Sequence, residues 1–436
     1  QAVDKPEHRS LLRKAAADGM VMLKNDGHLP ISNDIERLAV IGPNAENAQI
    51  IGGGSASLKP HYQAHPLSAF QNRLEPDIEV TFAKGCHTHK YLPMINENLM
   101  VNKKGFLVEY FSGDIKEQNL ISNEYLKGSK FWVFEGFAKD VISKEERPNI
   151  TVKFSCDYVP DISGQHQFEI FGIGQCKLLI NHDELIDNWD NPEQGEAFFT
   201  FSSSSRKGSI DLTAGETYKI EIHYHFEGKF PAVYIGCQAP DKSNLFDQAI
   251  ETAVNADQVI LMVGTNSDWE TEGNDRADFN LPADQNKLIH AVIEANSNTT
   301  VVVNTGSPVA MPWAENAKAI IQTWFPGQEF GNALVDVLSG SINPSGKLPT
   351  SFPVKIEDTP AYASYPGKNL QMNYEEKLLV GYRWYESQAI KPLFCFGHGL
   401  SYTTFQYDCL KVEINEEKEV TCKFTVENIG DITGSE

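Results

Sequence analysis

The chain has 436 residues, and 37 Lys and Arg stand against 59 Asp and Glu, which gives a formal net charge of −22. Hydrophobic residues make up 41% of the chain and aromatic residues 10%, which is enough to build cores and excludes a disordered chain. The negative charge argues against nucleic acid and anionic membrane surfaces as partners, because both are polyanions. No run of about 18 apolar residues is present to span a bilayer. We therefore expect a soluble protein, either cytoplasmic or secreted.

The first hundred residues combine helical and extended patterns. Apolar residues recur at helical spacing from Arg9 to Lys24, which predicts an amphipathic helix. The continuous apolar run Arg37–Pro43 predicts a buried strand of a parallel sheet, and Ile78–Phe82 predicts another strand. The glycine-rich segment Gly52–Ala56 lacks the GxGxxG and GK[ST] patterns of phosphate-binding loops. A tight, closely packed turn is the better interpretation of that segment.

Residues 105–237 have a different pattern. Short segments rich in β-branched and aromatic residues alternate with turn residues, which is typical of an all-β sandwich. The predicted strands are Phe106–Phe111, Ile150–Phe154, Gln167–Phe171, Cys176–Ile180, Thr217–His223 and Ala232–Ile235.

An alternation of helices and strands returns after residue 240. It predicts a mostly parallel sheet with right-handed crossovers, so the simplest organisation is one α/β domain interrupted by the sandwich. The tail from Ser401 resembles the first strands of a further β domain. The predicted helices are Leu245–Val254, capped by Ser243 or Asn244, Asp284–Ala295 and Gly331–Leu338, and the predicted strands are Gln258–Gly264, Thr299–Asn304 and Ala319–Thr323.

The seven cysteines are dispersed and form no CxxC pattern. Their odd number and wide spacing favour reduced, mostly buried thiols, and a disulfide from Cys156 to Cys176 or Cys237 stays open. The run Cys86-His87-Thr88-His89 crowds three metal-binding side chains into four residues, which is poor geometry for a tetrahedral site. We expect neither a metal nor a cofactor.

The loop after the predicted strand Gln258–Gly264 is the best candidate for chemistry. Ligands of parallel sheets bind beyond the carboxyl ends of the strands. Crowded carboxylates raise one another's pKa, which can keep a Glu protonated as a general acid, and a Trp can stack on a sugar ring. An acidic surface loop or a structural cation loop is the alternative. The candidate side chains within residues 268–276 are Asp268, Trp269, Glu270, Glu272, Asp275 and Arg276.

A second loop, after the predicted strand Thr299–Asn304, contains a serine. Thr305-Gly306-Ser307-Pro308 follows a predicted strand but lacks the GxSxG elbow, which argues against a serine hydrolase.

Several segments together resemble glycoside hydrolase family 3 β-glucosidases over nearly the whole chain. The run Trp269–Arg276, followed by Leu281-Pro282, resembles the family's acid/base loop. The other matching segments, in the family's order, are Ala15–Asp26, Ala39–Ala45, Gly53–Ala56, Trp324–Glu329, Asn343–Pro349 and Phe396–Tyr402.

The resemblance also implies a domain organisation. Leu107–Phe111 and Leu185–Trp189 resemble the protective-antigen (PA-14) sandwich that some members carry as an insert. The expected parts are a linker helix with the first part of a six-stranded, mostly parallel α/β sandwich domain (1–104), the PA-14-type insert (105–240), the remainder of the α/β domain (241–400) and the start of a fibronectin type III-like domain (401–436).

The family's chemistry is retaining hydrolysis of terminal, non-reducing β-D-glucosyl residues by two carboxylates. Matching the Glu-Gly-x-Asp-Arg core of the loop points to Glu272 as acid/base, with Glu270 as runner-up. The resemblance further implies that Asp275 and Arg276 brace the loop, and that Trp269 and Asp268 border the sugar. β-Glucosides or oligosaccharides would be the substrates.

The family's Asp nucleophile lies on an N-terminal TIM barrel that would precede Gln1. The chain also lacks an initiator Met and ends after the strand-like run Val420–Val426, so we expect a fragment that is inactive alone. A homo-oligomer is compatible with the sequence. The alternatives are a carbohydrate-binding or adhesion protein that uses the PA-14-type sandwich, and a β-xylosidase or N-acetylglucosaminidase of the same family.

Overall fold

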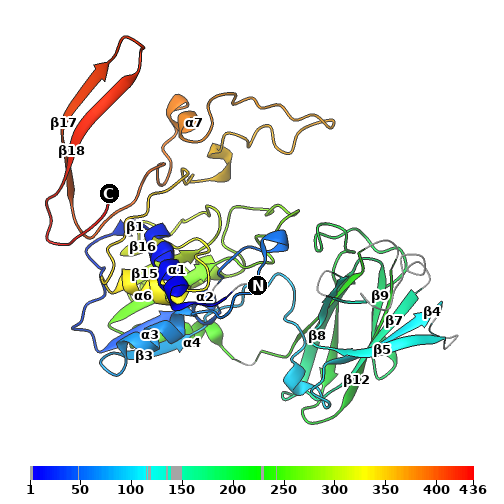
Figure 1. Ribbon diagram of the computed structural model, residues 1–436. Coiled ribbons are helices and arrows are strands. Elements are labelled where there is room, and N and C mark those ends of the chain that lie inside the picture. Colours follow the sequence, from blue (N-terminus) through cyan, green and yellow to red (C-terminus); the bar gives the residue numbers. More distant parts are fainter. Residues whose placement is uncertain are drawn as a thin grey trace. The chain divides into compact units, whose positions relative to one another are not determined.

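The computed structural model describes residues 3–47, 49–113, 115, 119–133, 136–138, 150–226, 230–241 and 243–436. The chain forms two compact units (Figure 1). The first comprises residues 1–88, 244–270 and 276–436, and the second comprises residues 89–243 and 271–275. The second unit begins ahead of the change of pattern at Gly105, because Met94 and Met100 form bridges to its strand residues Gly236 and Tyr158.

The first unit is built on a six-stranded sheet with the order β1-β16-β15-β14-β2-β3. All neighbouring strands are parallel except β1, which runs antiparallel to β16. The central strands are buried along their length, which explains their continuous apolar sequences. The strands are β1 (Val21–Asn25), β2 (Arg37–Ile41), β3 (Glu79–Ala83), β14 (Gln258–Gly264), β15 (Thr299–Asn304) and β16 (Ala319–Gln322).

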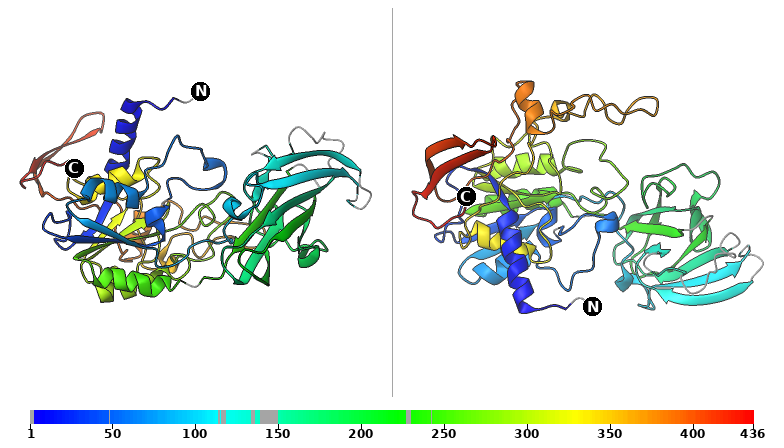
Figure 2. Two further views of the ribbon diagram at one scale, coloured as in Figure 1. Left: turned by 90° about the horizontal axis from the view of Figure 1, so that it is seen from below. Right: turned by 45° about the horizontal axis from the view of Figure 1, so that its top comes forward.

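Helices cover both faces of this sheet (Figure 2). One buried cluster contains residues of α1, α3 and α6, and another on the opposite face contains residues of α4 and α5. Asn244 caps α4, since its side chain accepts a hydrogen bond from the Asp247 N–H. The helices are α1 (Pro6–Gly19), α2 (Pro43–Glu46), α3 (Pro66–Leu74), α4 (Leu245–Val254), α5 (Gln285–Ala295) and α6 (Phe330–Leu338).

The predicted helix Arg9–Lys24 is wrong in its second half. The helix ends at Gly19, and Val21–Asn25 forms β1, whose first three residues are all buried. An edge strand covered on both faces has a continuous apolar run, which short windows do not distinguish from a helix. The two leucines at positions 11 and 12 are exposed, so α1 buries only Ala16 and Ala17.

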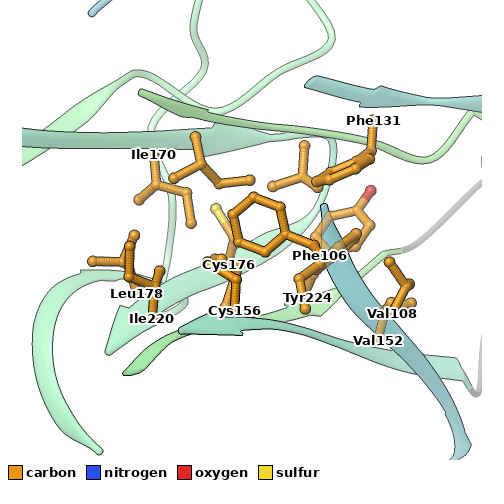
Figure 3. Close-up of a cluster of buried hydrophobic side chains, with 14 of the residues drawn as sticks. Phe106, Val108, Phe131, Val152, Cys156, Ile170, Cys176, Leu178, Ile220 and Tyr224 are labelled. Atoms are coloured by element: carbon orange, nitrogen blue, oxygen red, sulfur yellow. The ribbon is translucent and has the colours of Figure 1, made fainter. Parts of the chain in front are cut away.

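The second unit contains two antiparallel sheets, with the orders β10-β9-β12-β7-β4-β5 and β11-β8-β13-β6. Their facing side chains form one buried cluster, in which Phe131 and Ile170 of one sheet meet Cys156 and Leu178 of the other (Figure 3). The strands are β4 (Phe106–Ser112), β5 (Leu120–Leu126), β6 (Lys130–Trp132), β7 (Ile150–Tyr158), β8 (Gly164–Gly172), β9 (Gln175–Ile180), β10 (Asp183–Asn188), β11 (Arg206–Leu212), β12 (Tyr218–His225) and β13 (Ala232–Gln238).

Four strands of the second unit were not expected from the sequence, namely β5, β6, β10 and β11. All four lie at the edges of their sheets. An edge strand has a neighbour on one side only and buries fewer side chains, so its sequence is more polar.

The remainder of the first unit contains α7 (Tyr382–Ser387) and a hairpin of β17 (Phe405–Ile414) and β18 (Val420–Asn428). The hairpin side chains are exposed apart from a half-buried Phe405. All seven cysteines are free thiols, so the open disulfide from Cys156 does not form. No helix in the described ranges is long and apolar enough to cross a membrane.

Candidate active site

The candidate loop begins at the carboxyl edge of the parallel sheet. β14 ends at Gly264 and β15 at Asn304, and these two residues are register partners in the parallel pair. The loops that follow them, residues 265–284 and 305–318, therefore start side by side. This is the edge at which parallel sheets bind ligands.

A buried asparagine holds several loops together at this edge. The Asn304 amide donates to the carbonyl oxygens of Gln49 (3.0 Å) and Trp324 (2.6 Å). Its Oδ1 accepts from Asn44 Nδ2 (3.0 Å) and from the Gln49 N–H (2.9 Å). Every hydrogen-bonding position of this fully buried side chain is thus used, and the loops after β2, β15 and β16 are fixed to one another.

A buried glutamine closes the candidate loop on itself. Gln285, at the start of α5, accepts a hydrogen bond from the Gly264 N–H (2.8 Å). Its Nε2 donates to the carbonyl oxygens of Gly264 (2.8 Å) and Pro282 (2.9 Å). The two ends of the loop therefore meet at one side chain.

Glu270 is tied into the first unit through its carboxylate and its carbonyl oxygen. Its carboxylate accepts from Thr265 Oγ1 (2.6 Å), from the Gly306 N–H (3.0 Å) and from Ser307 Oγ (3.2 Å). Its carbonyl oxygen accepts from the Gly53 N–H (2.9 Å). The segment rejected as a serine-nucleophile elbow thus anchors a carboxylate, and the glycine-rich segment 52–56 packs against the same residue.

Trp269 and Asp268 are held just before Glu270. Trp269 Nε1 donates to the Thr88 carbonyl (2.7 Å), which sets the direction of the indole ring. The Asp268 N–H donates to Asn266 Oδ1 (2.9 Å), a short turn of the Asx type. Both side chains are half-buried.

Arg276 makes a main-chain contact at the far end of the loop. Its Nη2 donates to the Pro308 carbonyl (2.8 Å), so the loop 305–308 holds both Glu270 and Arg276. Its Nη1 is buried and has no hydrogen-bond partner among the described residues.

Between these anchors, residues 271–275 belong to the second unit. Thr271 and Asn274 form an antiparallel bridge that encloses Glu272 and Gly273 in a tight turn, with Gly273 at φ +77°. Glu272 and Asp275 are both exposed. The two candidate acid/base residues therefore differ in setting: Glu270 is bound at the base of the loop, and Glu272 lies at its tip.

A polar cavity of about 360 Å³ opens beside the base of the loop, within the first unit. Its lining includes Gly52, Ser57, Gln63, His65 and Ser267. Groups with hydrogen-bonding capacity thus surround the start of the loop.

The structure holds no group of three or more His, Cys, Asp and Glu side chains that could bind a metal, as far as the described residues extend. Burial raises the pKa of the Cys86 thiol to about 12, so this residue of the Cys-His-Thr-His run stays protonated at neutral pH.

Sequence reasoning missed the supporting residues Asn304, Gln285, Thr265 and Ser307. A weak signal was present, because Asn304 ends an otherwise β-branched run, Thr299–Val303, in a fully buried strand. A buried polar residue at the end of such a strand needs partners, and the adjacent loops supply them.

Comparison with known proteins identifies the family. Residues 20–402 match the glycosyl hydrolase family 3 C-terminal domain. The chain is 36% identical to a probable beta-glucosidase I of Emericella nidulans, over 100% of this chain and 54% of that protein. It is 35% identical to a beta-glucosidase of Rhizobium radiobacter, over 100% of this chain and 53% of that protein. The chain thus spans about half the length of the curated relatives it matches.

Solved structures agree with the sequence match. The beta-glucosidase of Kluyveromyces marxianus in complex with glucose superposes with a TM-score of 0.86 at 32% identity, over 98% of this chain and 52% of that chain. DesR, a beta-glucosidase from Streptomyces venezuelae in complex with D-glucose, gives a TM-score of 0.63 at 28% identity, over 98% of this chain and 49% of that chain. The fold, the carboxyl-edge loops and these matches lead to one conclusion: the chain belongs to glycosyl hydrolase family 3, through the C-terminal domain of that family.

Proposed function

We propose that this chain is the C-terminal part of a retaining β-glucosidase that releases terminal glucosyl residues, and that Glu272 is its general acid/base. Relatives named beta-glucosidases match the whole chain, and two solved relatives contain glucose. The chain spans about half of them, which leaves room for a barrel that carries the Asp nucleophile.

The observation that carries the assignment is the contrast between the two glutamates. A general acid must reach the leaving oxygen and exchange its proton during the reaction. The Glu270 carboxylate accepts hydrogen bonds from Thr265 Oγ1, the Gly306 N–H and Ser307 Oγ, which hold it against the first unit at the base of the loop. Glu272 is exposed at the tip of a turn, where a substrate can approach it.

The proposed steps follow from two carboxylates. The nucleophile attacks the anomeric carbon while Glu272 donates its proton to the glycosidic oxygen, and a glucosyl-enzyme ester forms as the aglycone leaves. Glu272 then takes a proton from water, which hydrolyses the ester. Trp269 and Asp268 would border the sugar, and Arg276, with Asp275 beside it, would keep the loop in place.

We further propose the PA-14 identity of the inserted sandwich and the fibronectin type III-like identity of the C-terminal hairpin. Exposed apolar side chains support the second assignment, because β17 leaves Leu410, Val412 and Ile414 exposed. An isolated hairpin is marginally stable and needs further strands to cover such a face. Exposed Leu11 on α1 (66%) is consistent with a covering domain there.

The test uses the full-length protein and the variants Glu272→Gln, Glu272→Ala and Glu270→Ala. Glu272→Gln should reduce kcat/KM for an alkyl β-glucoside by about 10²–10⁴-fold, because a poor leaving group needs the proton. An activated aryl glucoside should lose much less in its first step. Azide should rescue Glu272→Ala by forming a β-glucosyl azide.

Two outcomes would overturn the assignment. One is near-normal hydrolysis of the alkyl glucoside by Glu272→Gln, and the other is azide rescue of Glu270→Ala but not of Glu272→Ala. The 436-residue chain alone should not hydrolyse an aryl β-glucoside, because the proposed Asp nucleophile lies on the N-terminal barrel. Measurable turnover by the purified chain would contradict the two-part site.

A further inference from the structure

The tip of the candidate loop packs against an aromatic residue of the second unit. A Cβ atom placed on Gly273 would lie 3.3 Å from Phe199 Cα and 3.5 Å from its Cδ1. Gly273 is therefore in direct contact with Phe199, and its positive φ of 77° leaves the turn little freedom to accept a side chain. Glu272 is the residue immediately before this contact.

Phe199 belongs to an unusual backbone turn, which we call the aromatic turn (residues 198–201). Phe198, Phe199 and Thr200 have φ values of 51°, 60° and 66°. Three successive non-glycine residues in the left-handed region are rare, and bulky side chains are disfavoured there. Hydrogen bonds from the Phe201 N–H to the Phe198 carbonyl (3.2 Å) and from Gln194 Nε2 to the Thr200 carbonyl (3.0 Å) close the turn.

Ring packing holds the aromatic turn on the sandwich. The Trp132 ring of β6 lies 5.6 Å from Phe199 and 5.7 Å from Phe198, between ring centroids. Phe171 of β8 lies 5.9 Å from Phe198. A strained turn persists only where its surroundings fix it, and such turns concentrate at functional sites. The sandwich thus presents Phe199 to the loop tip on a rigid support.

We propose that Phe199 is a positioning residue for Glu272: it fixes the turn Thr271–Asn274 through its contact with Gly273. The acid/base role of Glu272 rests on the proposed function, whereas the contact itself does not. A shift of about 1 Å at a reacting group can reduce a rate by about 100-fold, so a fixed turn matters for proton transfer. The inserted sandwich therefore takes part in the chemistry by holding the acid/base in place.

The first experiment measures hydrogen exchange by mass spectrometry on the purified 436-residue chain. Phe199→Ala should increase exchange of the amides in residues 271–275 by about 10-fold or more, because the turn loses its support. Phe201→Ala is the matched control, since Phe201 lies in the same turn but is 65% exposed. Phe199→Leu should restore most of the protection. The proposal would be overturned if the amides of residues 271–275 exchanged equally fast in Phe199→Ala and Phe201→Ala. It would also be overturned if neither Phe199→Ala nor Phe199→Leu changed the exchange of these amides.

The second experiment separates this proposal from the proposed function. In the full-length protein, Phe199→Ala should reduce kcat/KM for an alkyl β-glucoside by about 10-fold or more and affect an activated aryl glucoside less. In a Glu272→Gln background the same substitution should have almost no further effect. If the losses of kcat/KM caused by Phe199→Ala and Glu272→Gln were fully additive, Phe199 would not act by positioning Glu272. If Glu272→Gln alone left activity normal, the proposed function would fail while the exchange result still decided the contact.

Discussion

The two edges of the parallel sheet in the first unit are built differently. At the carboxyl edge, long loops such as 265–284 and 305–318 leave the strands, and the buried amides of Asn304 and Gln285 bind them. At the amino edge, short connections such as 255–257 and 296–298 enter the strands. The contacts of Asp257 there are exposed, whereas the Asn296 amide donates to the Ala253 and Ala256 carbonyls in a half-buried setting.

The two edges satisfy their main-chain groups in different ways. Every strand end leaves main-chain groups that need partners. Exposed edges can use water, so short turns suffice there. A site edge must exclude water from its base, and it needs fully satisfied buried side chains to hold loops long enough to carry a catalytic group. Three substitutions test whether the two edges really differ in this way.

The largest effect is expected for Asn304→Ala. It would leave four buried groups without a partner, namely Asn44 Nδ2, the Gln49 N–H and the carbonyl oxygens of Gln49 and Trp324. Each such group costs about 1–3 kcal/mol, so we expect a loss of about 4 kcal/mol or more in unfolding free energy. Denaturant titration of the chain measures this loss. Asn298→Ala, at the amino edge, should cost less than about 0.5 kcal/mol. Similar losses of unfolding free energy for Asn304→Ala and Asn298→Ala would show that the two edges do not differ in this way.

An intermediate effect is expected for Glu270→Gln. The Gln side chain has one acceptor oxygen and turns an amide donor toward the hydroxyl or N–H groups that Glu270 now binds, which should cost about 1–3 kcal/mol. Thermal denaturation of the chain provides the measurement. Glu272→Gln is the matched control, and its stability should change by less than about 0.5 kcal/mol. A larger loss for Glu272→Gln than for Glu270→Gln would reverse the roles given to the two residues.

The smallest effect is expected at the amino edge and depends on pH. The N–H groups of Arg37 and Glu36 donate to Asp257 (2.8 Å each) and lower the pKa of its carboxyl group below 3.8. A depressed folded-state pKa contributes stability above the unfolded-state value, and this contribution is lost as the pH falls through the folded-state value. The stability difference between the unsubstituted chain and Asp257→Asn should therefore be larger at pH 7 than at pH 3.

Unfolding curves at both pH values check this expectation. Glu294→Gln, which removes an exposed carboxylate from α5, controls for the change in net charge. A difference that grows toward pH 3 would mean that the carboxylate of Asp257 does not stabilise the folded state through these N–H groups.

Much of the fold was predictable from local pattern. The boundaries of β14, β15 and α4 agree with prediction, because each is a clear apolar run or stripe bounded by polar and capping residues. The acidic loop was also identifiable, because it follows a buried strand of a parallel sheet. The family match was visible in the order of short motifs along the chain, and the domain match over residues 20–402 confirms it.

What the sequence by itself determined is therefore which segments are buried and which loop carries the carboxylates. Only the tertiary structure decided that Val21–Asn25 is a strand, because its partner β16 lies about 300 residues away. It also decided that Glu270 is bound at the loop base while Glu272 lies at the tip, beside Gly273, which contacts the aromatic turn. A sequence pattern reports burial, whereas hydrogen-bond partners and edge pairings are made between residues distant in the chain. The role of each carboxylate depends on those long-range partners.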